Sequence, residues 1–147
     1  MWKSIIIIGL LITISSCGSK QTTMKSSKEA TEIVLGENQV VSYKSLGNGV
    51  AAISLELYKN NTFNFNFKSI PQPETDEKAV IVSEKGTYIS EGNWKTLNFK
   101  NPKFSLAAIF DATYGDSSHF MVLDKENVKI NTSKNALPIW GVICEKQ

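Results

Sequence analysis

The sequence predicts an all-β fold, either a small antiparallel β-barrel or a sandwich of about eight to ten short strands. Residues 63–68 alternate strictly between phenylalanine and a polar residue, which is the period of a strand with one buried face. Clusters of Asn, Gly and Pro separate further apolar runs at a spacing of roughly ten residues. No window has the apolar stripe of an amphipathic helix, so helices are not expected.

The size and charge of the chain exclude several classes of protein. It has 147 residues, of which 41% are hydrophobic and 10% aromatic, enough for one domain with a packed core. The 16 basic residues, all lysine, nearly balance 14 acidic ones. Without arginine the bidentate group that reads guanine edges and phosphates is missing, and no nucleic-acid partner is expected. With two cysteines and one histidine, neither a framework of several disulfides nor a Cys/His metal site is expected, and no cofactor is implied.

Residues 1–16 have the three parts of a secretory signal peptide. A short start containing Lys3 precedes ten residues, 5–14, that are isoleucine or leucine except for Gly9 and Thr13, and small residues follow. As a helix these ten residues would span about 15 Å, roughly half the hydrocarbon thickness of a bilayer. We therefore expect a cleaved signal peptide and not a permanent transmembrane helix.

The cleavage zone Ile14-Ser15-Ser16-Cys17 resembles the lipobox of bacterial lipoproteins, with Ile14 in place of the family's commonest leucine. The resemblance implies that Cys17 is lipidated by palmitate-type acyl chains, becomes the first residue and anchors the chain to the membrane. More than one acyl chain is attached in this family, which is enough for stable anchoring. The alternative is an ordinary signal peptide that happens to contain a cysteine.

The residue after the cysteine indicates whether the anchor lies in the inner or the outer membrane. In the lipoproteins that this chain resembles, an aspartate there favours retention in the inner membrane; here the residue is Gly18, which favours the outer membrane. No acidic cluster follows, which favours an anchor that faces the periplasm over display at the cell surface. Residues 18–31 are polar and contain one large apolar side chain, Met24, so we expect 17–32 to be a lipidated cysteine and a flexible tether with a reach of roughly 20 Å.

Residues 33–147 are expected to form the β-domain. Asn60 and Asn61 lie between two alternating runs and predict a hairpin turn, because asparagine tolerates positive φ. Turns are also expected at 91–93, 100–102, 125–127 and 134–135, and a polar loop at 71–77. The expected strands are 40–43, 53–58, 63–68, 79–83, 86–90, 94–99, 104–110, 119–123, 127–131 and 138–145.

An apolar strand, an Asn turn, an aromatic strand, the run Gly86-Thr87-Tyr88 and a strand that begins at Trp94 follow one another in the chain. This order, over roughly residues 53–100, resembles the lipocalin-like small barrels found among bacterial lipoproteins, of which the NlpE-like envelope-stress and copper-resistance family is the nearest named relative. The resemblance implies a lipocalin-like barrel. The Cys-x-x-Cys of that family is absent, so its metal and redox properties are not implied here.

The aromatic residues of the β-domain can fill its core, or they can line a cavity if the barrel is wider than its side chains can fill. For the second case the residues expected to contact an apolar ligand are Phe65, Tyr88, Trp94, Phe110 and Trp140. The segment 138–145 is apolar on both faces and predicts a central strand that is covered on each side, or a strand that faces a ligand cavity. Gly141 is expected at a bulge or at a close backbone approach, and Cys144 as a buried structural cysteine.

Signals for catalysis are weak. A Ser-His-Asp set could be drawn from Ser117 or Ser118, His119, and Asp111 or Asp116. Adjacent residues of a strand point to opposite faces, so Ser118 and His119 should diverge unless they lie in a turn. No Gly-x-Ser-x-Gly elbow is present, and the spacing of Asp111 and Asp116 does not match a calcium loop. We expect no catalytic residue and no metal site.

These observations predict a monomeric, non-enzymatic protein of the cell envelope, anchored by lipid, that binds a small apolar ligand or an envelope component. The alternative is a protein-binding inhibitor or an envelope-stress sensor that acts through exposed loops such as 70–78. A sealed aromatic cavity would favour the ligand, and a filled interior with an exposed apolar patch would favour the protein partner.

Overall fold

The computed structural model describes residues 38–46 and 49–147. The predicted signal peptide, the lipidation site Cys17 and the predicted tether lie outside the described residues. Within the described part the chain forms strands joined by tight turns and by longer loops, and one single-turn helix. The elements are β1 (Gln39–Ser45), β2 (Ala51–Tyr58), β3 (Thr62–Ser69), β4 (Ile81–Glu91), β5 (Trp94–Asn98), α1 (Leu106–Ile109), β6 (Phe120–Val122), β7 (Asn127–Asn131), β8 (Ala136–Ile139) and β9 (Val142–Lys146).

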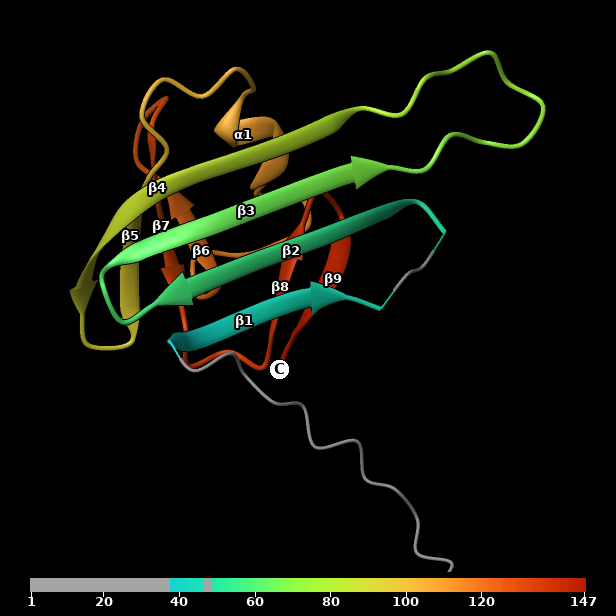
Figure 1. The fold of residues 1–147 in the computed structure, drawn as a ribbon. Helices are drawn as coiled ribbons and strands as arrows, with labels where there is room; N and C mark the ends of the chain where they lie inside the picture. Colours follow the sequence, from blue (N-terminus) through green and yellow to red (C-terminus); the bar gives the residue numbers. More distant parts are fainter. Residues whose placement is uncertain (1–37, 47–48) are drawn as a thin grey trace, which may run out of the picture. The chain divides into compact units, whose positions relative to one another are not determined.

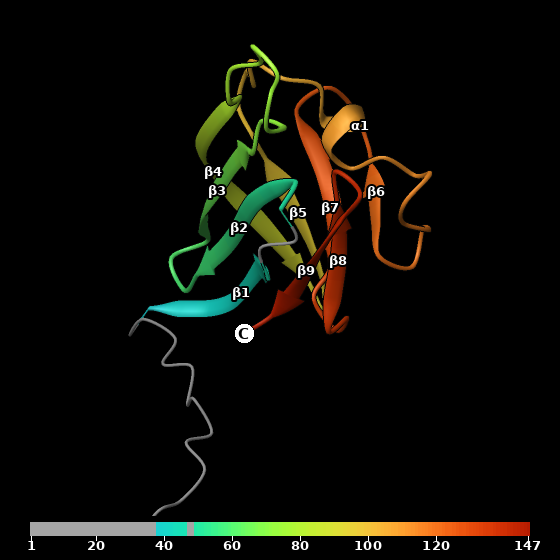
Figure 2. The ribbon, with the colours of Figure 1, turned by 90° about the vertical axis from the view of Figure 1, so that its right-hand side faces the viewer.

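The strands form one antiparallel sheet in the order β6-β7-β5-β4-β3-β2-β1-β9-β8. The sheet curls into a nearly closed barrel, with β1–β4 on one side of the core and β6–β9 on the other (Figures 1 and 2). The predicted all-β class is confirmed, and of the two predicted architectures, barrel or sandwich, the chain forms the antiparallel barrel. Among the described residues no helix has the length and hydrophobicity that crossing a membrane requires.

The hairpin of β2 and β3 forms as the alternating pattern predicts. Phe63, Phe65 and Phe67 are buried on the inner face, opposite the apolar residues of β2, and the polar residues between them lie on the outer face. Asn61 at the turn has a φ of 61°, the left-handed conformation that asparagine accepts more readily than most residues. The register places one complete apolar face toward the core.

The two strands expected at 79–83 and 86–90 are one continuous strand, β4, so that part of the prediction is wrong. Gly86 looked like a break in the sequence but lies in the middle of the strand, opposite Phe63 of β3. Its missing side chain leaves room for the Asn98 carbonyl oxygen and the Phe63 ring, which lie close to it. Glycine therefore marks a close approach here and not the end of a strand.

The strand expected at 104–110 is also wrong, because residues 106–109 form the single-turn helix α1. Ser105 caps it: its side-chain oxygen accepts a hydrogen bond from the Ala108 N–H at 3.3 Å. Leu106 and Ile109, three residues apart, are buried. One helical turn contributes only one such pair, which is too little for the helical period to stand out in a sequence.

The segment expected as the single strand 138–145 is a second hairpin, β8–β9. Trp140 and Gly141 form its two-residue turn, with φ angles of 51° and 69°. Positive φ at both central positions is the geometry of the turns that join twisted strands tightly. Gly141 therefore serves a turn and not the predicted bulge. Cys144 on β9 is fully buried, as expected, and burial raises the pKa of its thiol to about 12.

Candidate functional site

Two of the five predicted ligand-contacting aromatic residues, Phe65 and Phe110, are part of the core. Both are almost completely buried and their ring centroids lie 6.3 Å apart. Phe99 contacts both rings, with centroid distances of 5.8 Å to Phe65 and 6.4 Å to Phe110. Phe104 packs on Phe65 from another direction, 5.9 Å away. Because aromatic partners surround these rings, a ligand could reach them only by displacing part of the core.

Tyr88 and Trp94 lie apart from that cluster. The Tyr88 ring is buried and its hydroxyl donates a hydrogen bond to the Tyr58 carbonyl oxygen at 2.7 Å. Trp94 lies on β5, three residues before the buried Leu97, and so on the outer face of the sheet. The Lys129 Nζ atom is 6.0 Å from the centroid of the Trp94 ring, a cation–π distance. The structure thus does not bring the five predicted residues to one site.

The fifth residue, Trp140, lies at the surface in an unusual conformation. Its φ of 51° is rare for a bulky side chain and is held by contacts on both sides. The Trp140 N–H donates to the Ile109 carbonyl oxygen at 2.6 Å, and its ring packs edge-on against Phe67 with centroids 5.0 Å apart. The fold thereby fixes a partly exposed tryptophan at the tip of a hairpin.

Trp140 is one of several exposed apolar side chains at one end of the barrel. It lines a pocket of about 410 Å³ together with Val50 and Tyr114. The Ile70 N–H donates to the Val50 carbonyl oxygen at 2.8 Å, which connects the pocket to the β3–β4 loop. We call this group the apolar rim. Its members are Val50, Ile70, Val80, Tyr114 and Trp140, with exposed fractions of 43%, 41%, 58%, 60% and 37%.

Most of the apolar rim was not identified from the sequence. Tyr114 lies between Asp111 and Asp116, in a segment for which the sequence predicted no site, and its ring is the nearest neighbour of Gly141, 3.2 Å from where a Cβ atom would stand. The loop 70–78 predicted as a contact segment includes Ile70, whereas Val80 lies two residues beyond that loop, at the other end of the β3–β4 connection. Isolated large apolar residues within polar loops are the signal that could have found them.

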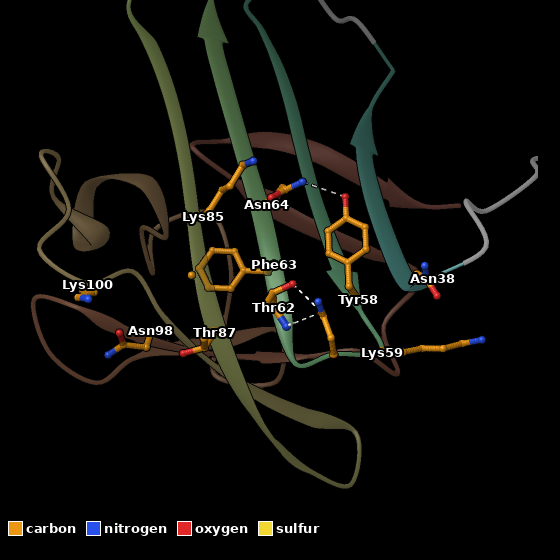
Figure 3. Close-up of a pocket in the computed structure, with 12 residues that line it drawn as sticks. Asn38, Tyr58, Lys59, Thr62, Phe63, Asn64, Lys85, Thr87, Asn98 and Lys100 are labelled. Carbon is orange, nitrogen blue, oxygen red and sulfur yellow. Dashed lines mark hydrogen bonds between the residues drawn. The ribbon is translucent and has the colours of Figure 1, made fainter.

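A second hollow lies on the outer face of the sheet, at the opposite end of β2 and β3. This groove has a volume of about 970 Å³. Figure 3 shows its side chains, which come from the first residues described and from β2 to β5. The lining residues are Asn38, Tyr58, Lys59, Asn60, Thr62, Asn64, Lys85, Thr87, Asn98 and Lys100, together with Gly86 and the buried Phe63 opposite it.

The structure brings Asp116, Ser118 and His119 together. Ser118 and His119 lie in the turn before β6 and not in a strand, so their side chains need not point to opposite faces. Asp116 Oδ1 accepts hydrogen bonds from the Ser118 N–H at 2.8 Å and from its hydroxyl at 2.6 Å, and lies 2.8 Å from His119 Nδ1. These contacts, the Ser118 hydroxyl first, hold the pKa of the Asp116 carboxyl well below its usual range. The hydroxyl is bonded to the carboxylate and not to the imidazole, so the three groups do not form the relay of a hydrolase triad.

Asp111 forms its hydrogen bond within its own loop. Its carboxylate accepts from the Thr113 N–H at 2.8 Å, which lowers the pKa of Asp111. In the described part of the chain, no three His, Cys, Asp or Glu side chains are grouped to hold a metal ion. Comparison with protein-family models, with curated proteins and with solved structures finds no match for this chain.

Proposed function

We propose that this chain is a lipid-anchored, non-enzymatic binding protein of the bacterial envelope, whose barrel docks an envelope protein through the apolar rim. The observation that carries the proposal is the rim itself: five large apolar side chains from four separate segments are left exposed at one end of the barrel. Contiguous exposed apolar surface with a polar margin is typical of protein-interaction sites. Exposed Glu74, Asp76 and Glu77 follow Ile70 along the β3–β4 loop and supply part of that margin.

The packed interior favours a protein partner over a ligand held inside the barrel. Phe65, Phe99 and Phe110 contact one another in the core, whereas Tyr114 and Trp140 present ring surface to solvent. Half-exposed tyrosine and tryptophan side chains on a rigid turn lose little conformational freedom on binding, and such residues dominate protein interfaces.

The direction of β1 shows which end of the barrel carries the apolar rim. β1 begins at Gln39, paired with Tyr58 at the end of β2, and reaches the opposite end of the barrel at Ser45. The rim residues Val50 and Ile70 lie at that opposite end, beside the start of β2 and the end of β3 (Figure 1). Asn38, the first residue of the described part of the domain, therefore lies at the far end of the barrel from Val50 and Ile70.

The anchor in this proposal rests on the lipobox-like segment that ends at Cys17. The variant Cys17→Ser is expected to abolish labelling by a radioactive or clickable fatty acid and to release the protein from the membrane fraction, because it removes the thiol that carries the acyl chain and leaves only the buried Cys144. The full chain is compared with this variant in the same cells. A Cys17→Ser chain that still carries label and still sediments with membranes would contradict the anchor, whatever the rim binds.

The rim is tested by site-specific photocrosslinking of the full chain in the cells that produce it. A benzoyl-phenylalanine placed at Ile70 or at Tyr114 is expected to give one common protein adduct. The matched control is Asn66, an exposed residue of β3 on the outer face of the sheet, from which no adduct is expected. The change Val80→Lys should reduce the adduct from Tyr114 by about tenfold, since a buried unpaired charge costs at least 1.4 kcal/mol in an interface.

Two results would contradict the docking proposal. One is an absence of adducts from both rim positions, and the other is an equal yield of the same adduct from Asn66. An adduct from Tyr114 with the mass of a lipid or another small molecule would instead favour the apolar ligand, bound in the pocket that Val50, Tyr114 and Trp140 line.

A further inference from the structure

The outer-face groove differs from the rim in the chemistry of its lining. Four asparagines, two threonines, a tyrosine and three lysines contribute to it, and no aspartate or glutamate does. Its volume of about 970 Å³ is at the upper end of the range for small-molecule sites. The side chains from β2, β3 and β4 project on the same side of the sheet, because register pairs Asn64 with Lys85 and Thr62 with Thr87.

One aromatic ring in this groove is fixed in position by hydrogen bonds. The Tyr58 hydroxyl donates to Glu56 Oε2 at 2.8 Å. It also accepts from the Asn64 side-chain N–H at 2.9 Å, the bond that Figure 3 shows. Glu56 is held in turn by Lys44, whose Nζ atom lies 3.4 Å away. A half-buried ring clamped in this way offers a flat apolar surface without the entropy cost of ordering it when a ligand binds.

Around the Tyr58 ring, the groove has hydrogen-bond donors and acceptors that a ligand can use. Asn64 uses its side-chain N–H for Tyr58, which leaves its side-chain oxygen to accept a hydrogen bond. Asn98 likewise uses its amide nitrogen, which donates to Asn127 at 2.9 Å. The Thr87 hydroxyl, which can donate and accept, has no partner within the described residues. A ligand that matches this lining must carry groups that can both donate and accept hydrogen bonds, as sugar hydroxyls do.

The groove also carries positive charge. Lys85 lies beside Asn64 in the middle of the view, with Lys59 and Lys100 at the two sides (Figure 3). In the described part of the chain the ion pairs join other residues, and none of these three lysines takes part in one. Three ammonium groups without a carboxylate among the lining residues attract an anion. Of the three, Lys85 lies beside Asn64 and so next to the amide groups of the groove (Figure 3).

We propose that this groove is a binding site for an acidic oligosaccharide. A sugar ring would stack its C–H face on Tyr58, its hydroxyls would bond to Asn64, Asn98 and Thr87, and its carboxylate or phosphate would meet Lys85. Each part of the lining has a role in this ligand, whereas a simple inorganic anion would leave the tyrosine and the amides unused. The site is separate from the apolar rim and does not depend on what the rim binds.

The test is isothermal titration calorimetry on the full chain in detergent, with trigalacturonate as the acidic probe, and with neutral maltotriose and inorganic phosphate as comparison probes. Trigalacturonate is expected to bind, and the two comparison probes at least tenfold more weakly. Lys85→Gln and Thr87→Glu should each weaken trigalacturonate binding by about tenfold or more, one by removing a positive charge and the other by adding a negative one. The exposed position of Thr87 keeps the second variant folded even if the first is perturbed.

Lys68→Gln is the matched control, because Lys68 is exposed on the same strand and the same face as Asn64 but lies outside the groove. Its affinity for trigalacturonate should equal that of the unmodified chain. The site is disproved if trigalacturonate fails to bind, or if Lys68→Gln weakens it as much as Lys85→Gln. Equal affinity for inorganic phosphate would show an anion site without sugar recognition and overturn the proposal, and equal affinity for maltotriose would overturn its acidic part. None of these results bears on crosslinking from the rim.

Discussion

Replacing Gly86 with alanine is expected to destabilise the barrel by about 3 kcal/mol or more. A Cβ atom at this position would stand 2.1 Å from the Asn98 carbonyl oxygen and 2.6 Å from Cε1 of Phe63. The carbonyl oxygen belongs to the backbone of β5, so it cannot rotate away as the end of a side chain can. The alanine variant must therefore separate β4 from β5 or push Phe63 out of its place in the core.

The effect is measured as the free energy of unfolding, from urea titrations followed by tryptophan fluorescence. Gly92 provides a matched control in the turn between β4 and β5: its φ is +61°, and a Cβ there would meet nothing within 4 Å. Gly92→Asn should change the free energy of unfolding by less than about 0.5 kcal/mol, because asparagine accepts this conformation. A loss of less than about 1 kcal/mol for Gly86→Ala would show that the two strands are not held as closely as the structure places them.

Gly86 also shows why the strand boundaries were harder to predict than the fold class. Phe63, Phe65 and Phe67 are spaced two residues apart, so all three rings lie on the same face of the strand. The sequence alone therefore identifies the inner face of β3. A glycine within a strand can mark a turn, a bulge or a close approach, and only the position of β5 decides among these. At Gly141 the outcome was the opposite, a true turn, because the neighbouring Trp140 adopts a positive φ that its residue type does not favour.

The candidate sites were less predictable than the fold for a related reason. Alternation tells which side chains of a strand face inward, as Phe65 does, but it does not tell whether other rings, such as that of Phe110 beyond α1, fill the space around them. The apolar rim joins Val50, Ile70 and Tyr114 from loops that are distant in the sequence and meet only in the closed barrel. The groove likewise needs the register of β2 to β5, which no local pattern specifies before the turns are known.

Replacing Phe65 with alanine is expected to cost about 3–5 kcal/mol of the free energy of unfolding. The Phe65 side chain is fully buried and contacts three rings, those of Phe99, Phe104 and Phe110, at centroid distances of 5.8, 5.9 and 6.3 Å. Truncation removes the apolar surface of the ring and leaves a cavity that this tightly packed cluster can close only in part. Since small domains have only about 5–15 kcal/mol in total, the variant should be close to unfolding.

Urea unfolding of Phe65→Ala, Phe65→Leu and the unmodified chain distinguishes a core residue from a ligand-lining one. For a core residue the leucine variant should lose about 1–2 kcal/mol and remain folded, because it fills most of the cavity. The rim should be unaffected in that variant, so photocrosslinking from Tyr114 should give the same adduct in the same yield. If Phe65→Ala instead cost less than about 1 kcal/mol, the ring would face open space, and the interior of the barrel would again be the place to look for an apolar ligand.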